Sequence, residues 1–125
     1  MSKQCISTTQ APAAIGPYSQ AVRHGNTLFV SGQLPLDPAT KKMPDDVREQ
    51  TRQAMSNIRA IVEAAGGSLD QVARCGIFVT DLADFAAINE EYASFFSGDY
   101  PARATVQVAA LPLGAKVEID AIAIL

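Results

Sequence analysis

Arg103 is the residue for which this sequence most clearly indicates a chemical role. It stands in the stretch YPARATVQVAALP, at the head of a predicted strand over residues 104–110, and the nearest charged residues along the chain are Asp99 and Lys116. A cation in an apolar strand needs an acidic partner, an exit to solvent or a ligand, because an unpaired buried charge is costly. The stretch itself is compatible with all three.

A second charged group, Glu118, lies in the last predicted strand, KVEIDAIAIL, at residues 116–125. Side chains alternate between the two faces of a strand, so Glu118 shares a face with Asp120, and Arg103 shares one with Thr105. Each of the two strands then has one apolar face and one face with polar residues. A solvent-exposed face explains this pattern as well as a binding site does.

The expected pairing of these two strands separates the two charges. If a four-residue loop joins them in a hairpin, Ala110 pairs with Ala115 and Gln107 lies opposite Glu118. Arg103 is then four residues further along, roughly 13 Å away at the rise of a strand. A direct salt bridge within the hairpin is therefore not expected, which leaves a ligand between the two groups or a meeting across chains.

The sequence offers no usual metal site. It contains one histidine, His24, in the turn signal HGN, and two distant cysteines, Cys5 and Cys75. Zinc and iron sites need more ligands than these. Cys5 falls in a loose N-terminal tail and Cys75 inside an apolar strand, so we interpret Cys75 as a reduced core thiol rather than part of a disulfide framework.

Composition limits the classes of partner. The net charge is −3, the sequence pI is about 5.0 and the sequence shows no basic run, whereas nucleic-acid binding requires clustered Lys and Arg. The start MSKQCISTTQAP has no apolar core of a signal peptide. No apolar run approaches the roughly 20 residues of a membrane span. We therefore expect a cytoplasmic protein that binds no membrane, and the composition argues weakly against nucleic-acid binding.

Local patterns predict two helices and three regions of β-strand: an N-terminal set, one strand in the middle and a C-terminal pair. Residues 1–17 form an extended, loop-like lead-in, because prolines and a glycine gather at its end. The helices are predicted from apolar residues at steps of three and four. The expected strands lie at 18–23 and 27–32, with a short piece at 33–36, then at 71–80, 104–110 and 116–125; the helices lie at 45–65 and 82–97.

The order of these elements, ββ(β)αβαββ, predicts an α+β fold with a mixed β-sheet and two helices on one face. The whole chain, residues 1–125, fits one domain. With 48% hydrophobic residues it can form a core, but a chain this short leaves the second sheet face to be covered. A second copy of the protein is the obvious cover, so we expect a homo-oligomer.

Four spaced motifs give the sequence a specific resemblance. IGPYSQAV, FVSGQLPLDP, ARATVQV and KVEIDAIA occur in this order over nearly the whole chain, and together they resemble the Rid imine-deaminase family, also called YjgF or L-PSP proteins. The resemblance implies chorismate-mutase-like subunits that form a homotrimer with clefts between neighbours. It also implies hydrolysis of reactive enamines and imines, such as 2-iminobutanoate and 2-iminopropanoate, to 2-oxo acids and ammonia without a cofactor or metal.

The resemblance also assigns roles to seven residues. It places Arg103 on the substrate carboxylate, which a guanidinium fork binds through two parallel hydrogen bonds, and Glu118 on the hydrolytic water. Tyr18 would line the cleft, and the expected chemistry gives its hydroxyl a hydrogen bond to the leaving nitrogen. The other expected substrate-binding residues are Ser31, Gly32 with its backbone amide, Asn89 and Thr105.

The sequence departs from the family pattern at Thr105. Many deaminase members have cysteine two residues after the arginine, so thiol-based regulation is not expected at this position. Each role also has a structural rival: Arg103 as an interface anchor, Glu118 as a solvated carboxylate, Tyr18 as a packing residue. Two other functions stay open, an L-PSP-type endoribonuclease and a non-catalytic binder of small 2-oxo acids.

Overall fold

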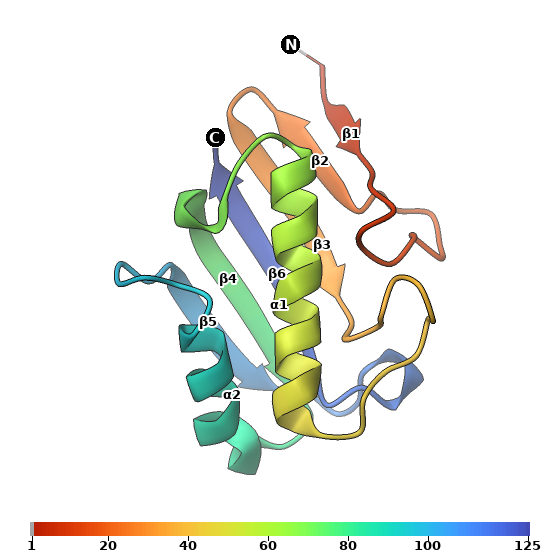
Figure 1. The fold of residues 1–125 in the computed structure, drawn as a ribbon, viewed down its shortest axis with the longest axis vertical. Coiled ribbons are helices and arrows are strands. Elements are labelled where there is room, and N and C mark those ends of the chain that lie inside the picture. Colours follow the sequence, from red (N-terminus) through yellow and green to blue (C-terminus); the bar gives the residue numbers. More distant parts are fainter. Residues whose placement is uncertain (1) are drawn as a thin grey trace.

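Two α-helices lie on one face of a six-stranded mixed sheet in the computed structural model, which describes residues 2–125 (Figure 1). The strand order in the sheet is β1-β2-β3-β6-β4-β5. The strands are β1 (Gln4–Ile6), β2 (Ala21–His24), β3 (Thr27–Gln33), β4 (Val72–Val79), β5 (Ala102–Gln107) and β6 (Val117–Ile124), and the helices are α1 (Val47–Ala64) and α2 (Phe85–Ala93). The predicted α+β class, with both helices on one face, is confirmed.

The predicted hairpin between the last two strands is wrong. β4 lies between β5 and β6; it pairs with β5 in parallel and with β6 antiparallel. Glu118 is therefore opposite Phe78 of β4, and not opposite Gln107. β6 occupies the centre because four of its alternate residues are apolar and buried against the helices, and a central strand must be covered along its whole length.

The N-terminal lead-in is more ordered than predicted. β1 forms antiparallel pairs with β2, and Cys5 lies opposite Val22. The Gln20 side chain then holds the following loop: its Oε1 accepts a hydrogen bond from the backbone N–H of Thr8 at 2.7 Å, and its Nε2 donates one to the Pro12 carbonyl at 2.8 Å. The N-terminal region therefore has a third strand, β1, which precedes the hairpin of β2 and β3. The third strand that was expected at 33–36 does not form, because β3 ends at Gln33.

α1 forms as predicted because its start and end signals are local. The carboxylate of Asp46 accepts a hydrogen bond from the Glu49 N–H at 3.0 Å and caps the first turn. At the other end, Gly66 has a φ of 92°, a left-handed conformation that costs glycine little. The buried stripe of α1 includes Met55, Ile58 and Val62, and it packs on the sheet.

The second predicted helix, at 82–97, is shorter in the structure. A 3₁₀ turn at Leu82–Asp84 precedes α2, and the Asp81 carboxylate caps it by accepting from the Ala83 N–H at 2.9 Å. α2 then buries Ile88 and Tyr92 over β4 and β5 (Figure 1). Within residues 2–125, no helix combines the length and the apolar character that crossing a membrane requires.

Candidate active site

Arg103 lies on the helix-covered face of the sheet, under α2. It sits opposite the buried Cys75 in the β4–β5 ladder. Its Cζ atom is 5.2 Å from the ring centroid of Tyr92 and 5.6 Å from that of Phe85, both in α2. These are cation–π distances, so two rings hold the guanidinium without using its N–H groups. No ion pair in residues 2–125 includes Arg103, and its donors are available to a ligand.

Three buried polar atoms of α2 and β5 lack a hydrogen-bond partner in residues 2–125: Asn89 Oδ1, the Tyr92 hydroxyl and Thr105 Oγ1. The Tyr92 hydroxyl adjoins the Cys75 thiol, which is only a weak hydrogen-bonding group. Burial, more than any neighbouring group, raises the pKa of both Tyr92 and Cys75. Unpartnered buried polar atoms are rare, and a cluster of them indicates a place for a ligand or another chain.

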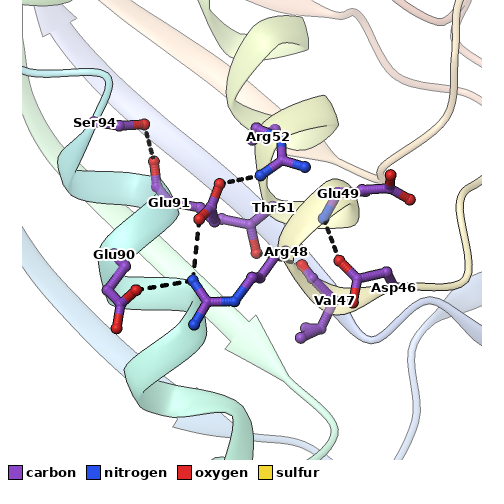
Figure 2. A network of polar contacts seen from close by, with 9 residues as sticks. All are labelled: Asp46, Val47, Arg48, Glu49, Thr51, Arg52, Glu90, Glu91 and Ser94. Carbon is purple, nitrogen blue, oxygen red and sulfur yellow. Dashed lines mark hydrogen bonds and ion pairs between the residues drawn. The ribbon is translucent and has the colours of Figure 1, made fainter.

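Ion pairs between α1 and α2 hold the second helix in place (Figure 2). Arg48 Nη1 lies 2.9 Å from Glu90 Oε2 and 3.1 Å from Glu91 Oε2, and Arg52 pairs with the second oxygen of Glu91. The hydrogen bond from Arg52, and then that from Arg48, hold the pKa of Glu91 below its usual value. The arginines and Glu90 are exposed and only Glu91 is largely covered, so each pair contributes little to stability. The pairs connect α1 to the helix that carries Asn89 and Tyr92.

Glu118 lies on the opposite face of the sheet, which no helix of residues 2–125 covers. It is opposite Phe78, which in turn is opposite the exposed Val106 of β5. A Cβ atom at Gly32 of β3 would lie 3.0 Å from Glu118 Cδ, so glycine leaves room for the carboxyl beside the β3 backbone. Burial raises the pKa of Glu118, and the charge of Asp120 raises it further.

A pocket of about 540 Å³ opens beside Glu118. Its walls come from the lead-in, from the end of β3 and from the uncovered faces of β4 and β6. The residues that line it are Pro12, Ala13, Ile15, Tyr18, Ser31, Gly32, Gln33, Leu34, Leu36, Phe78, Pro112, Glu118 and Asp120. Among the residues of the described chain that line this pocket, two carry carboxylates and none is Lys or Arg.

Ser31 and Gly32 stand at a β-bulge that shapes the pocket. The register of β3 on β6 shifts between Val30 and Gln33, as expected where a strand is bent beside a site. The Ser31 hydroxyl donates a hydrogen bond to the Ser19 carbonyl at 2.6 Å, so it anchors the lead-in next to Tyr18. The Tyr18 side chain is 49% exposed and its hydroxyl accepts from a single backbone N–H, that of Ile15, at 3.4 Å.

The structure therefore divides the predicted site residues into two groups. The pocket group consists of Tyr18, Ser31, Gly32 and Glu118, and the arginine group consists of Arg103, Asn89 and Thr105. The groups lie on opposite faces of the sheet. In residues 2–125, no three or more His, Cys, Asp and Glu side chains are placed to hold a metal ion together.

Three residues beside these groups were missed by sequence reasoning, and one of them is Tyr92, whose ring contacts the Arg103 guanidinium. Asp120 shares the pocket with Glu118, and strand alternation had already placed both on one face. Phe85 lies within the second predicted helix, at 82–97, without an assigned role; it is 41% exposed and contacts the Arg103 guanidinium. No local pattern distinguishes such a residue from a core aromatic.

Comparisons with known proteins agree with this fold. The family model of endoribonuclease L-PSP matches residues 8–125. Protein DfrA of Myxococcus xanthus is 55% identical, over 99% of this chain and 97% of that protein. A 2-iminobutanoate/2-iminopropanoate deaminase of mouse is 48% identical, over 98% of this chain and 91% of that protein. The crystal structure of E. coli TdcF with bound serine has a TM-score of 0.96 at 48% identity and covers 98% of each chain.

The fold and the pocket define an α+β protein with a carboxylate-lined site on the uncovered face of its sheet. The chain belongs to the L-PSP family, which is the Rid or YjgF family that its four motifs resemble.

Proposed function

We propose that this protein is a cofactor-independent deaminase that hydrolyses small 2-imino acids, such as 2-iminopropanoate and 2-iminobutanoate, to 2-oxo acids and ammonia. The observation that carries the proposal is the state of Arg103: two rings hold its guanidinium, and no carboxylate in residues 2–125 pairs with it. A planar substrate carboxylate fits this fork. The name of the mouse relative supports the same substrate class.

We further propose that the active site forms between subunits of a homotrimer. Arg103 and Glu118 lie on opposite faces of the sheet, so they cannot act on one small substrate within one chain. The uncovered face also exposes large apolar side chains: Phe29 is 49% exposed, Val106 46% and Ile124 45%. A neighbouring subunit on this face would cover them and would bring its own arginine group to the pocket group.

The expected reaction needs a held substrate and a positioned water. Arg103 of one subunit binds the carboxylate, with Thr105 and Asn89 beside it. Glu118 of the next subunit takes a proton from water while the water oxygen bonds to the imine carbon and the C=N π electrons move to nitrogen. The proton then passes from Glu118 to nitrogen. Glu118 takes the hydroxyl proton as the remaining C–N bond breaks, the C=O group forms and ammonia leaves. Tyr18 can hydrogen-bond this nitrogen.

The environment of Glu118 suits the base in this scheme. A general base is most effective when its pKa is near the working pH, and burial together with Asp120 raises the pKa of Glu118 toward that range. No metal or cofactor is required by the scheme, because the carbon of a protonated imine is already electrophilic. Thr105 has no thiol, so the scheme is not subject to oxidation at that position.

The experiment couples a pyridoxal-phosphate-dependent serine or threonine dehydratase to this protein and follows the decay of the imine intermediate. Wild-type protein should accelerate the decay, and Arg103→Ala should abolish the effect while the oligomer stays intact. Decay at the spontaneous rate in the presence of wild-type protein would refute the deaminase. An Arg103→Ala variant with full activity would refute the assignment of the site.

The family name favours a second candidate, an endoribonuclease. The pocket argues against it, because two carboxylates and no cation of the described chain line it, and RNA phosphates need positive charge. RNA cleavage that persists in both Arg103→Ala and Glu118→Ala would point to a different site. A non-catalytic binder of 2-oxo acids would instead show ligand-induced stabilisation without turnover.

A further inference from the structure

Asp120 is seated on the backbone of β4 beside the pocket. Its Oδ1 accepts a hydrogen bond from the Gly76 N–H at 2.9 Å. A Cβ atom at Gly76 would lie 2.5 Å from this oxygen, closer than any real contact, so the carboxylate occupies the space that a side chain would fill. The Asp120 carboxylate can occupy this position only because residue 76 is glycine. The Asp120 carboxylate is thereby fixed on the same strand face as Glu118, two residues away.

Three neighbouring segments contribute charged or titratable groups around Glu118. β6 contributes Asp120, and Lys116, which immediately precedes β6, donates from its Nζ to the Asp45 carbonyl at 2.8 Å. β4 contributes Arg74, whose Nη1 lies 3.5 Å from the missing Cβ position of Gly76. The lead-in contributes Tyr18, and the part of β3 that lines the pocket is uncharged.

Of these groups, Asp120 is the one that shares both the strand and the pocket lining with Glu118. Besides burial, it is the cause that raises the pKa of the Glu118 carboxyl. A like charge that is held still has a larger effect than one on a free side chain, because it cannot move away when its neighbour ionises. The hydrogen bond from Gly76 provides this restraint.

We propose that Asp120, held by the Gly76 amide, is a positioning residue that controls the charge state of Glu118 and so sets the pH range in which Glu118 acts as a base. This inference rests on the proposed deaminase function, because it deepens the role of Glu118 in that reaction. Asp120 does not touch the substrate in this scheme; it acts through Glu118. Gly76 contributes because its lack of a side chain leaves space for the Asp120 carboxylate.

The test combines a titration with a rate profile. The side-chain carboxyl carbons of the glutamates are labelled with ¹³C, the Glu118 signal is identified by its loss in Glu118→Gln, and its midpoint is followed with pH by NMR. In Asp120→Asn, which keeps the size of the side chain, the Glu118 midpoint should fall by about half a unit to one unit, the range for one nearby like charge. Asp120→Glu, which restores a negative charge, should return the midpoint most of the way.

The acid limb of the imine-hydrolysis rate should shift to lower pH by the same amount in Asp120→Asn. A Glu118 midpoint unchanged by this substitution would overturn the proposal. A midpoint that falls while the rate limb stays in place would also overturn it, because Asp120 would then not act on catalysis. The NMR titration needs no turnover: a midpoint that falls in a protein without imine hydrolysis would refute the deaminase and still support the control of Glu118 by Asp120.

Discussion

Arg103 and Glu118 lie on opposite faces of one sheet, and β4 separates the strands that carry them. Arg103 lies under α2 between two aromatic rings, whereas Glu118 lines a pocket on the face without helices. A small substrate cannot reach both within one chain. A site that uses both residues therefore requires two subunits, and experiments with mixed oligomers of two variants can test this.

The first prediction is that two inactive variants complement each other. Arg103→Ala and Glu118→Gln are each expected to be inactive, but oligomers formed from an equal mixture after unfolding and refolding should regain roughly a quarter of the wild-type rate. That share follows because each interface has a one-half chance of an intact arginine and a one-half chance of an intact glutamate. Each variant refolded alone is the control. No recovery in verified mixed oligomers would contradict a shared site.

The second prediction concerns the geometry of the cation. Arg103→Lys keeps the charge but loses the fork that binds a carboxylate with two parallel hydrogen bonds. The loss of one charge-assisted hydrogen bond corresponds to about 1.5–3 kcal/mol, so kcat/KM should fall on the order of 10- to 100-fold. The steady-state rate of imine hydrolysis measures this change. A lysine variant with unchanged kcat/KM would show that charge alone is sufficient.

The third prediction concerns Phe85, whose ring lies 5.6 Å from the Arg103 Cζ atom. Phe85→Leu removes one of the two rings that hold the guanidinium, and an exposed cation–π contact is worth about 0.5–1 kcal/mol. We expect KM to rise a few-fold. The ring is 41% exposed, so the free energy of unfolding should change little. Phe85→Tyr keeps the ring and is the matched control; a KM as high as that of the leucine variant would exclude the ring contact.

The fourth prediction follows from the raised pKa of Glu118. A carboxyl whose pKa is higher in the folded than in the unfolded protein destabilises the fold when it is ionised. The protonated carboxyl is the form that the fold tolerates. Its contribution to stability is therefore fully present below the pKa of the unfolded protein, about 4.3, and is lost as the pH rises through the pKa of the folded protein. Glu118→Gln should therefore be more stable than wild type at neutral pH, and the difference should vanish in acid. Urea unfolding at several pH values measures it; a glutamine variant less stable at neutral pH would contradict the sign.

The fifth prediction has the opposite sign and concerns Glu91, whose pKa is lowered mainly by its hydrogen bond from Arg52. The contribution of Glu91 to stability is present above its pKa in the unfolded protein and is lost as the pH falls through its pKa in the folded protein. Glu91→Gln should be slightly less stable than wild type at neutral pH and equal to it in strong acid. Glu49→Gln, on the first turn of α1, is the control outside the ion-pair network (Figure 2). A Glu91→Gln effect that persists in strong acid would show that packing, not charge, is lost.

The elements that the sequence predicted well have local causes. α1 has its cap at Asp46, its stop at Gly66 and its apolar stripe within one segment, so its neighbours in space were not needed to find it. β1 was missed because three residues with one buried side chain carry no periodic signal. Its existence depends on pairing with β2, which a local pattern cannot show.

For the site, the sequence by itself determined which residues share a face within each strand. The alternation that groups Arg103 with Thr105 and Glu118 with Asp120 is a property of the extended backbone and agrees with the structure. Only the tertiary structure decided how the two strands relate. Insertion of β4 between β5 and β6 is a long-range pairing; it puts the arginine under α2, leaves the glutamate on the open face and allows Asp120 to rest on Gly76.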